Sequence, residues 1–573
     1  PTIMKIGMAQ LGPTTGDLES NAQSIVDALE QAKTRDCDLV VTPETAITGY
    51  MSCDLLEVDA YVRANKRLLL QKVAPATRNL TAIVGFVDYS PDDGTIRNRY
   101  NAAAIIQDGE VVNVAHKRCL CRYRFFDETR YYNPGDRTLV QPLDIGGRNV
   151  RVSPIICEDL WDENYAACPY DDAARDGADL MVVLNASPFE TGKWHRRMEL
   201  IREHQSRHCL PIVYTNTTGV GDNLKGLILF DGRSMVFDST GELTACAPFF
   251  QQGLTVVDLD DNLAGQGMVA RGWNEEEELH KALTFALREY CEDTGFERVV
   301  MGVSGGVDSS LCAALAAEAL GPDRVLGVTL PSRHSSSDTR EDAEKSCSNL
   351  GIEFAEIPIE DLYSCTLNNF TQWKTIQNSV TRENFQARLR GLLLMGISNE
   401  TGRMVIATGN KTELGLGYCT LYGDMVGGML LIGDVNKNQV YRLSKYINTE
   451  AGSPLIPESV LTRHPTAELA EAQKDPFDYS VVAPLVDDLI ARWDAETLLN
   501  HFRRRELKNH YPADLYERYD EESFRRLLDD IHRRYHQSAF KRSQASPIVI
   551  VSRRALGFDL RETIINRWQQ DMK

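Results

Sequence analysis

Short hydrophobic runs alternate with amphipathic stretches through the first half of the chain. An amphipathic helix is predicted over residues 18–34. Asp108-Gly109 lies between two of the runs and indicates a β-hairpin, because this dipeptide favours tight hairpin turns. Mixed strands with helices between them predict a layered α/β sandwich. The runs that we interpret as strands are residues 3–10, 38–42, 82–87, 102–107, 111–115, 150–156, 180–185 and 212–216.

The second half repeats the order strand, helix, strand, which predicts a doubly wound parallel sheet. Between the halves, residues 258–278 are polar, Gly-rich and finally acidic, which is typical of a linker and a helix start. We therefore expect a first domain over residues 1–260, a linker over 261–280 and a second domain over 281–573. The second-half strands are predicted at 299–303, 325–330, 354–359 and 405–408, with helices at 311–320 and 342–350.

Composition narrows the class of protein. The 573 residues are 43% hydrophobic and 25% charged, as in ordinary globular chains. The formal net charge of −20 argues against nucleic acid as the main partner, because binding its backbone requires a basic face. No run of 18 apolar residues exists, so we expect no membrane span. Thirteen cysteines without C-x-x-C pairs, and no secretory leader over residues 1–11, predict free thiols in a reducing cytoplasm.

Between a predicted strand and an Ala/Leu-rich helix lies the sequence Val303-Ser304-Gly305-Gly306-Val307-Asp308-Ser309-Ser310. A glycine turn between strand and helix aims backbone N–H groups and a helix dipole at a phosphate. No Lys follows the second glycine, so the loop differs from the common G-x-x-x-x-G-K-[ST] type. It is typical of enzymes that split ATP into AMP and pyrophosphate to adenylate a substrate.

Three reactive side chains end predicted strands in the first half, namely Glu44, Lys117 and Cys157. Sites in α/β proteins gather at the carboxyl ends of strands. Together the three suit amide hydrolysis through a thioester. Glu44 would take the thiol proton and return it to the leaving amine, while Lys117 would stabilise the oxyanion. Each alone is a weak signal, since strand-end charges are usually solvated and a cysteine is usually a small buried hydrophobe.

These residues lie in stretches that resemble the nitrilase, or carbon–nitrogen hydrolase, superfamily over roughly residues 3–257. The resemblance implies an α-β-β-α sandwich, and the context of Cys157 implies the glutaminase branch, which releases ammonia from glutamine. It adds Glu128 as a second glutamate beside the lysine. It also implies glutamine binding by Tyr123, Phe126, Ser187 and Arg196. The matching stretches are Pro43-Glu44-x4-Gly49-Tyr50, His116-Lys117, Phe126-Asp127-Glu128-x-Arg130-Tyr131-Tyr132-x2-Gly135, Cys157-Glu158-Asp159-x-Trp161 and Asn185-Ala186-Ser187-Pro188-Phe189.

Four ordered segments of the second half resemble the NAD synthetase family over roughly residues 275–553. They are Thr381-Arg382-Glu383-Asn384-Phe385-Gln386-Ala387-Arg388, Ala407-Thr408-Gly409-Asn410-Lys411-Thr412-Glu413, Leu421-Tyr422-Gly423-Asp424 and Ile432-Gly433-Asp434-x2-Lys437. The resemblance implies ATP binding by residues 304–310 and Thr408, and magnesium binding by Asp308 and Glu413. Deamido-NAD would be bound by Asn384, Arg388, Glu413, Asp424, Lys437, Thr466 and Lys541. Arg and Lys suit phosphates, and carboxylates suit Mg²⁺.

The chain departs from these families at three places. Residues 473–479 replace a more usual Gln-Thr-Asp-Glu run, Ser546-Pro547 replaces Pro-Pro, and the loop at 219–225 differs from the common hydrolase form. The differences affect local loop contacts and the coupling between sites rather than the chemistry.

Together the two resemblances imply a glutamine-dependent NAD synthetase activity, in which glutamine supplies ammonia to ATP-adenylated deamido-NAD. They also imply a homo-oligomer, a dimer or larger. One alternative is another loop-sharing amidotransferase, making GMP or asparagine. No Cys precedes Pro1, which disfavours the asparagine type, and a Cys-His-Glu context for the GMP type is missing. The other is a nucleotide-binding scaffold or sensor with two inactive sites.

Overall fold

The computed structural model describes residues 3–471, 473–507 and 510–566 and divides the chain into two compact units. The first unit comprises Pro1–Asn223 and Ile228–Asn274, and the second comprises Leu224–Leu227 and Glu275–Lys573. Helix α6 (Glu275–Thr294) begins where the units divide, so the last six residues of the expected linker are helical. Residues 1–2 and 567–573, which the expected domains include, lie outside the described residues.

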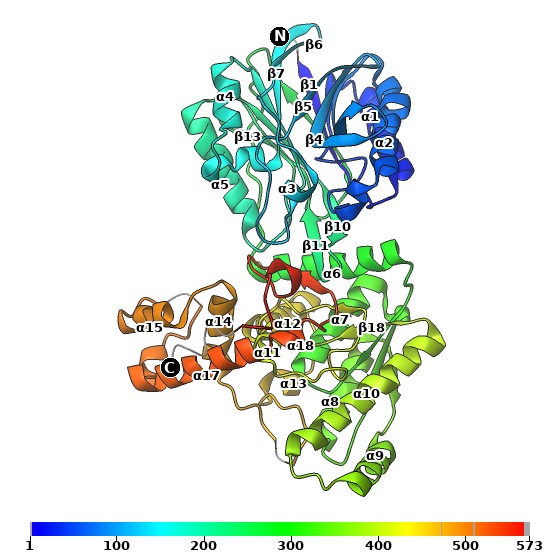
Figure 1. The fold of residues 1–573 in the computed structure, drawn as a ribbon, viewed down its shortest axis with the longest axis vertical. Helices are drawn as coiled ribbons and strands as arrows, with labels where there is room; N and C mark the ends of the chain where they lie inside the picture. Colours follow the sequence, from blue (N-terminus) through cyan, green and yellow to red (C-terminus); the bar gives the residue numbers. More distant parts are fainter. Residues whose placement is uncertain (1–2, 472, 508–509, 567–573) are drawn as a thin grey trace. The chain divides into compact units, whose positions relative to one another are not determined.

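Two six-stranded sheets form the first unit (Figure 1), in the orders β14-β1-β2-β3-β4-β5 and β13-β12-β9-β8-β7-β6. In each, three consecutive strands are parallel (β1-β2-β3 and β7-β8-β9) and the outer strands are antiparallel. The strands are β1 (Met4–Gln10), β2 (Leu39–Val41), β3 (Thr81–Asp92), β4 (Ile96–Gln107), β5 (Glu110–His116), β6 (Gln141–Ile145), β7 (Arg148–Ile156), β8 (Leu180–Asn185), β9 (Ile212–Asn216), β12 (Met235–Phe237), β13 (Leu243–Cys246) and β14 (Gly253–Leu259), with β10 (Thr218–Asp222) and β11 (Gly226–Asp231) between β9 and β12.

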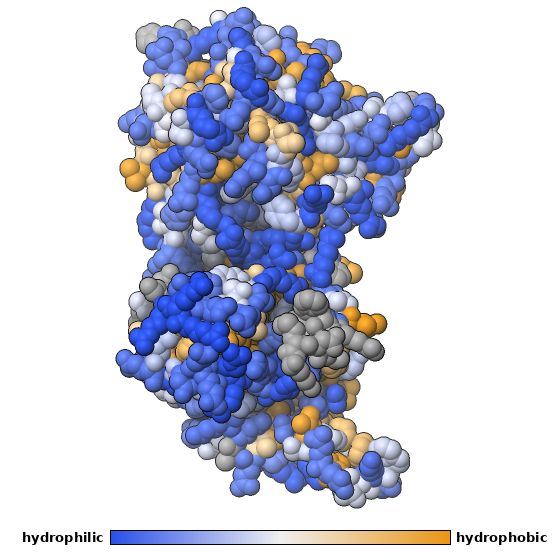
Figure 2. Space-filling view, turned by 60° about the vertical axis from the view of Figure 1, so that its left-hand side comes forward, coloured by the Kyte–Doolittle hydropathy of each residue, from blue (hydrophilic) through white to orange (hydrophobic). Residues whose placement is uncertain are grey.

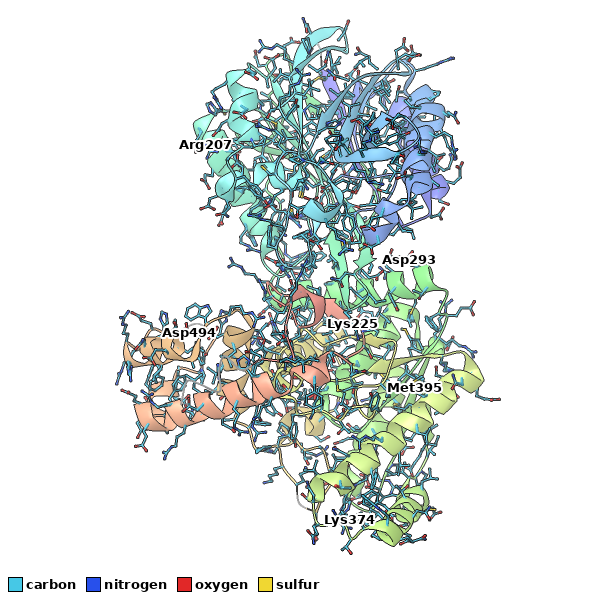
Figure 3. All side chains as sticks on the ribbon, in the orientation of Figure 1. Arg207, Lys225, Asp293, Lys374, Met395 and Asp494 are labelled. Atoms are coloured by element: carbon cyan, nitrogen blue, oxygen red, sulfur yellow. The ribbon has the colours of Figure 1, made fainter. Side chains whose placement is uncertain are left out.

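Successive side chains point to opposite faces of each strand, so each sheet has one face toward the other sheet and one face toward helices. The first unit therefore has four layers. Inward residues such as Ile6, Val41 and Leu184 form one apolar core between the sheets. The opposite faces pack against helices, α1 (Leu18–Thr34) on the first sheet and α4 (Pro169–Arg175) and α5 (Lys193–Arg207) on the second. Arg207, at the end of α5, is labelled in Figure 3. The predicted α-β-β-α sandwich is confirmed.

Strands β3 and β4 are longer than the hydrophobic pattern predicts, because they pair antiparallel from Thr81↔Gln107 to Asp92↔Ile96 through polar residues. Ladder hydrogen bonds between strands do not require apolar side chains, so periodicity alone underestimates such a pair. Shorter elements of this unit are α2 (Asp59–Leu68), α3 (Glu128–Tyr131), η1 (Cys53–Glu57), η2 (Leu69–Val73), η3 (Ala74–Thr77), η4 (Cys157–Leu160) and η5 (Asp162–Asn164).

The second unit contains a parallel sheet in the order β20-β19-β18-β15-β16-β17, as predicted. Helix α10 (Ser379–Thr401) packs on one face through Leu394, while α7 (Val307–Leu320) contacts β15 and β16. The strands are β15 (Val299–Gly302), β16 (Val325–Thr329), β17 (Glu353–Glu356), β18 (Met404–Ala407), β19 (Met429–Leu430) and β20 (Ile548–Ile550). Further helices are η6 (Pro322–Arg324), α8 (Ser337–Leu350), α9 (Glu360–Trp373), α11 (Lys411–Leu416), α12 (Lys437–Ala451), α13 (Glu458–Thr462) and η7 (Gly557–Asp559).

A group of C-terminal helices, which the strand–helix pattern did not reveal, packs against α11 in one large apolar cluster. Leu498, Phe502 and Phe524 are central to this cluster, and the Phe502 and Phe524 rings stack 4.1 Å apart. The group consists of α14 (Tyr479–Ile490), α15 (Ala495–Arg503), α16 (Leu515–Arg518), α17 (Glu521–Gln537) and α18 (Ala539–Arg542).

The drawn surface is mostly polar. The face drawn in Figure 2 is largely hydrophilic, with hydrophobic residues in small groups. Across the described residues, none of the helices combines the length and the hydropathy that a membrane crossing requires. All thirteen cysteines lie in the described part of the chain and are free, which confirms the prediction of free thiols.

The core between the two sheets of the first unit should be sensitive to lost volume. Leu184 is fully buried there, so Leu184→Ala should lower the free energy of unfolding of that unit by about 2–5 kcal/mol. Urea denaturation measures the loss. Val112→Ala is the control, because Val112 is 45% exposed and its truncation should change stability by no more than about 0.5 kcal/mol. Equal effects of the two substitutions would contradict this account of the core.

Candidate active sites

Glu44 follows strand β2 and is buried where β3 passes very close to the chain. Gly85 donates its backbone N–H to the Thr42 hydroxyl at 3.0 Å and accepts from Ala46 N at 2.9 Å. A Cβ at Gly85 would lie 2.2 Å from Pro43 O, so only glycine permits this approach. The tight crossing therefore fixes the backbone that presents the Glu44 carboxylate.

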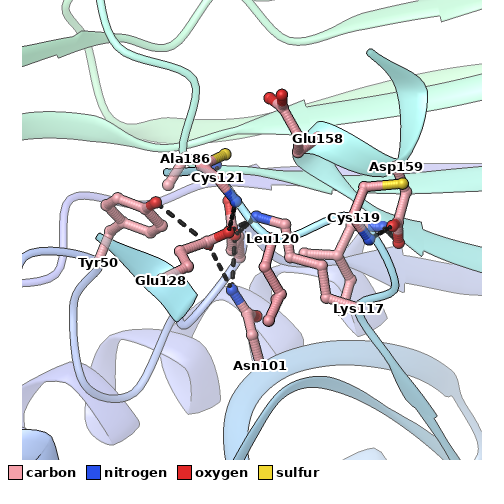
Figure 4. Close-up of polar contacts among 12 residues, drawn as sticks. Tyr50, Asn101, Lys117, Cys119, Leu120, Cys121, Glu128, Glu158, Asp159 and Ala186 are labelled. Carbon is pink, nitrogen blue, oxygen red and sulfur yellow. Dashed lines mark hydrogen bonds and ion pairs between the residues drawn. The ribbon is translucent and has the colours of Figure 1, made fainter. Parts of the chain in front are cut away.

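Lys117 directly follows β5 and lies between two carboxylates (Figure 4). Its Nζ is 2.7 Å from both Glu44 Oε1 and Glu128 Oε1, and all three side chains are buried. Burial by itself would lower the pKa of Lys117, but the charges of Glu128 and Glu44 raise it well above its usual value. The ammonium is therefore held charged inside the protein.

Most of the remaining polar atoms of this cluster are also paired, although Asn101 Oδ1 is buried without a hydrogen-bond partner among the described residues. Asn101 Nδ2 donates to Glu44 Oε1 at 2.7 Å, and the Tyr50 hydroxyl donates to Glu128 Oε1 at 3.1 Å. Cys121 N donates to Glu128 Oε2 at 2.7 Å. Sequence reasoning did not select Asn101, Tyr50 or Cys121 as functional residues. Tyr50 lies in one of the matching stretches, whereas nothing in the local pattern around Asn101 or Cys121 distinguishes them from core residues. Figure 4 shows these groups around Glu128.

Cys157 begins η4 at the carboxyl end of β7, with a left-handed φ of +46°. Its neighbour Ile156 pairs with Leu184 of β8, and just beyond β8 Ala186 N donates to Glu44 Oε2 at 2.8 Å. Burial raises the pKa of the Cys157 thiol well above its usual value, the Glu44 charge raises it further and the Lys117 charge opposes both. The structure therefore brings Glu44, Lys117, Glu128 and Cys157 together at one end of the sheets.

The predicted glutamine-binding residues lie around this cluster. The Phe126 ring meets those of Tyr50 and Tyr123 edge-on at 6.0 and 5.2 Å. The Tyr123 hydroxyl donates to Glu158 Oε2 at 3.1 Å, beside the cysteine. Ser187 follows β8 by two residues.

Of the two adjacent arginines on α5, the sequence analysis selected Arg196, which pairs with Glu190. Arg197 is the one that contacts Ser187, through Nε to the hydroxyl at 3.1 Å, and it also forms a buried bidentate pair with Asp231. Only the tertiary fold distinguishes the two, since neighbouring helix positions face different directions.

Lys193, the first residue of α5, is a further cation that the sequence analysis missed. Burial lowers its pKa to about 7, and the charges of Arg197 and Arg124 add to the effect. Within the described residues its ammonium has no ion-pair partner. The Cys157 charge also acts on Lys193, which indicates that it faces the same site.

The predicted phosphate loop connects β15 to α7 in the second unit. Gly305 has a left-handed φ of +82°, and a Cβ there would lie 2.1 Å from Thr339 O. Ser304 Oγ accepts from Gly306 N at 3.3 Å, which closes a tight turn before the helix. Arg463 Nη1 donates to Gly305 O at 3.3 Å and holds the loop from the far side. The local geometry is that of an anion cradle at a helix N-terminus.

Beside this loop, one lysine again lies between two carboxylates. Lys437 Nζ pairs with Asp308 Oδ2 and lies 3.4 Å from Glu413 Oε1, while Asn410 Nδ2 donates to Asp308 Oδ1 at 2.9 Å. Burial raises the pKa of Glu413 to about 8; the Lys437 charge lowers it and the Asp308 charge raises it. Across the described residues no group of three or more acidic, His or Cys side chains could hold a metal by itself. Two converging carboxylates nevertheless fit Mg²⁺, which is commonly held by one or two carboxylates together with substrate phosphates.

A cavity of about 210 Å³ adjoins the phosphate loop. Most of the residues predicted to bind ATP and deamido-NAD line it, whereas Ser310 faces the hydroxyl of Ser346 in the core. The predicted residues that line the cavity are Ser304, Gly305, Gly306, Val307, Asp308, Ser309, Thr408, Glu413, Asp424, Lys437 and Thr466.

Three other predicted deamido-NAD residues meet the segment 417–424 outside the cavity lining. Asn384 Oδ1 accepts from the Thr420 hydroxyl at 2.9 Å, and Arg388 Nε donates to Leu421 O at 3.1 Å. Lys541 Nζ donates to Gly417 O at 2.7 Å and to Cys419 O at 2.8 Å. Their side chains therefore hold the segment that carries Asp424.

Residues at two of the sequence departures make specific hydrogen bonds. The Ser546 hydroxyl, where a proline is usual, donates to Gly427 O at 2.8 Å. In the run 473–479, Asp475 accepts from the hydroxyls of Tyr418 and Tyr479 at 3.2 and 2.9 Å. Asp475 and Tyr479 were not among the predicted site residues.

Comparison with known proteins identifies both halves. Residues 5–267 match the carbon–nitrogen hydrolase family, and residues 279–545 match the NAD synthase family. The chain is 36% identical to the glutamine-dependent NAD(+) synthetase of Thermotoga maritima, with 99% of this chain and 100% of the relative aligned. It is equally identical to the enzyme of Acinetobacter baylyi, with 99% of each aligned.

Solved structures agree with this result. A glutamine-dependent NAD+ synthetase from Acinetobacter baumannii, solved in complex with ADP, is 32% identical and superposes with a TM-score of 0.76 over 99% of both chains. One from Cytophaga hutchinsonii, 20% identical, shares the fold with a TM-score of 0.80 over 98% of both chains. From these similarities along its whole length, the chain belongs to the glutamine-dependent NAD+ synthetase family.

Proposed function

We propose that this protein hydrolyses glutamine in its first unit and uses the ammonia to convert deamido-NAD into NAD⁺ in its second unit, with cleavage of ATP. The observation that carries the proposal is the presence of a buried Cys–Glu–Lys cluster and a pyrophosphate loop in one chain that aligns end to end with enzymes of this name. We assign the two reactions to the units that divide at Glu275. The end-to-end similarity disfavours a GMP- or asparagine-forming amidotransferase.

In the glutaminase reaction, Glu44 removes the thiol proton as Cys157 attacks the side-chain amide of glutamine. The burial that raises the pKa of Glu44 strengthens it as a base. Lys117 stabilises the tetrahedral oxyanion, and Glu128 keeps the ammonium in place. Glu44 then returns the proton to the leaving ammonia, and water hydrolyses the thioester. Tyr123, Phe126, Ser187 and Arg196 are the residues assigned to glutamine.

In the synthetase reaction, the loop 304–310 and Thr408 bind ATP. The nicotinate carboxylate of deamido-NAD attacks the α-phosphorus and pyrophosphate leaves. Activation is required because a free carboxylate is a poor electrophile. Ammonia attacks the resulting acyl group and AMP leaves. Asp308 and Glu413 are the residues that would hold Mg²⁺, which neutralises phosphate charge when bound.

Deamido-NAD is assigned to residues that line the cavity or hold its wall. Lys437 supplies positive charge for the phosphates once it exchanges Asp308 for a substrate group. Thr420 N donates a hydrogen bond of 2.7 Å to Asp424 Oδ1, which fixes the position of this carboxylate. The complete assigned set is Asn384, Arg388, Glu413, Asp424, Lys437, Thr466 and Lys541.

We also propose a cytoplasmic protein that acts on small molecules and binds neither nucleic acid nor membrane. Thirteen free cysteines suit a reducing compartment, and the net charge of −20 opposes binding to a polyanion.

A homodimer through α10 is part of the same proposal. Although α10 is rich in apolar residues, only four of its 23 residues are buried. Leu392 is 64% exposed, and Met395 lies one turn further along (Figure 3). Gly396 beside it has open space where a Cβ would project. An exposed apolar stripe with a small residue suits close packing against a second copy.

Cys157→Ala should abolish glutamine-driven NAD⁺ formation, by about 10³-fold or more, because it removes the thiol assigned to form the thioester. Formation from added ammonium salts should persist. NAD⁺ is quantified with each nitrogen source. Cys37→Ala, which truncates another buried cysteine, should retain both activities. Loss of the ammonium-driven reaction in Cys157→Ala would contradict the division of labour between the units.

Asp308→Asn should remove NAD⁺ formation from both nitrogen sources, since the phosphate loop loses the carboxylate that pairs with Lys437. Glutamate release from glutamine should continue, because the first unit is untouched. Both products are measured in one reaction mixture, with the exposed Asp323→Asn as the control. Full synthetase activity in Asp308→Asn would refute its assigned role.

Leu392→Glu should convert the oligomer into monomers, because a carboxylate on the apolar stripe of α10 would be buried unpaired in the dimer. Size-exclusion chromatography with light scattering gives the mass. Leu70→Glu, at a 49% exposed position of the first unit, should leave the mass unchanged. An unaltered mass for Leu392→Glu would exclude α10 as the interface.

A further inference from the structure

Arg197 on α5 is a fully buried cation that has no part in the proposed glutaminase reaction. A buried guanidinium is costly unless its charge is matched. Asp231, at the end of β11, matches it through two contacts, at 2.8 Å from Nη1 and 2.9 Å from Nη2. Burial by itself would lower the pKa of Arg197, but the charge of Asp231 raises it above its usual value. The guanidinium is therefore held charged and in one orientation.

The same guanidinium also holds the short segment 187–188. Nε donates to the Ser187 hydroxyl at 3.1 Å, and Nη2 donates to Ser187 O at 2.9 Å and to Pro188 O at 3.1 Å. In addition, Asn216 at the end of β9 accepts from Ser187 N at 2.9 Å and donates to Ser187 O at 3.2 Å. Ser187 is therefore fixed at its backbone and at its hydroxyl by residues of two other elements.

The contact from Arg197 decides how the Ser187 hydroxyl can bond. Because Nε donates to the hydroxyl oxygen, the single hydroxyl proton remains for another partner. Within the described residues no hydrogen bond has this hydroxyl as its donor. The neighbouring Tyr214 hydroxyl is buried and likewise has no hydrogen-bond partner in the described part of the chain. Ser187 thus presents a donor for an acceptor atom that the described residues do not supply.

This donor lies beside the reacting groups of the first unit. The residue before Ser187 is Ala186, whose N–H donates to Glu44 Oε2 at 2.8 Å, and Glu44 is the base proposed for Cys157. The charge of Cys157 also acts on Arg197, which indicates that the guanidinium lies near the thiol. Glutamine carries carbonyl and carboxylate oxygens, so a fixed hydroxyl donor at this place suits its binding.

We propose that Arg197 is a positioning residue of the glutaminase site, which holds Ser187 so that its hydroxyl donates a hydrogen bond to an oxygen of glutamine. The inference rests on the proposed function of the first unit. Arg197 acts through Ser187 and does not itself touch the substrate. Its pair with Asp231 supplies the rigidity, because the two contacts leave the guanidinium no other orientation.

Arg197→Lys tests this role, because an ammonium keeps the charge that Asp231 requires but cannot reach Asp231 and Ser187 in the same way. We expect the KM for glutamine to rise by about 10–100-fold, while kcat for glutamate release stays within about threefold of wild type. Glutamate release is measured over a range of glutamine concentrations. A retained kcat also shows that the first unit is folded.

A double-mutant cycle separates positioning from a purely structural role. If Arg197 acts through Ser187, Ser187→Ala should raise the KM by a similar factor. The combined variant Arg197→Lys/Ser187→Ala should then be no worse than the more affected single variant. Effects that multiply in the combined variant would contradict the inference. Arg197→Gln/Asp231→Asn removes the buried charges together and should raise the KM in the same way, which provides a second test if Arg197→Lys does not fold.

Arg202→Lys is the matched control, since Arg202 is an exposed arginine of the same helix. It should change neither KM nor kcat. A wild-type KM in Arg197→Lys or in Arg197→Gln/Asp231→Asn would overturn the inference, and so would a loss of kcat at unchanged KM. Failure of both variants to fold would also overturn it, because that outcome marks a role in the fold alone. Absence of glutamate release by the wild type would instead refute the proposed function, so the two failures are distinguishable.

Discussion

The pairing of Lys117 with Glu44 and Glu128 is the interaction on which the first unit depends. A buried ammonium is costly unless its charge is matched, and removal of one partner leaves an uncompensated charge inside the protein. Here the two contacts of 2.7 Å match the charge of the ammonium, and Asn101 Nδ2, the Tyr50 hydroxyl, Cys121 N and Ala186 N donate to the carboxylate oxygens. The cluster forms only if the ends of β2, β5 and β8 meet in the correct register. It therefore ties the reactive site to the integrity of both sheets.

The second unit also contains a buried lysine between two carboxylates, but there the arrangement has a different consequence. Lys437 also lies between two carboxylates, Asp308 and Glu413, next to a loop that offers backbone N–H groups. In the first unit, burial and then the negative charge of Glu44 raise the pKa of the Cys157 thiol while Lys117 opposes them, so a base is needed for attack. Under the proposed function, the same arrangement in the second unit presents exchangeable charges to a polyphosphate substrate. One electrostatic motif would then serve acyl transfer in the first unit and nucleotide binding in the second.

Glycine makes both arrangements possible by close approach of the backbone. At Gly85 and at Gly305, a Cβ would lie 2.2 and 2.1 Å from a carbonyl oxygen of a neighbouring segment. The first approach sets the turn that carries Glu44, and the second sets the phosphate loop against α8. Any side chain at these positions would displace a functional group by more than its hydrogen bonds tolerate.

The sequence by itself determined the elements whose signals are local. The hairpin at Asp108-Gly109, the parallel strands of the second half and the loop 303–310 follow from periodicity and turn chemistry, and the structure contains them. The tertiary structure alone decided which of Arg196 and Arg197 contacts Ser187, and placed Asn101 beside Glu44 across 57 residues of sequence. It also gathered the C-terminal helices into one cluster and aimed Asp475 at the nucleotide cavity. These features depend on which distant segments pack together, and pairing between distant segments leaves no periodic trace in one chain.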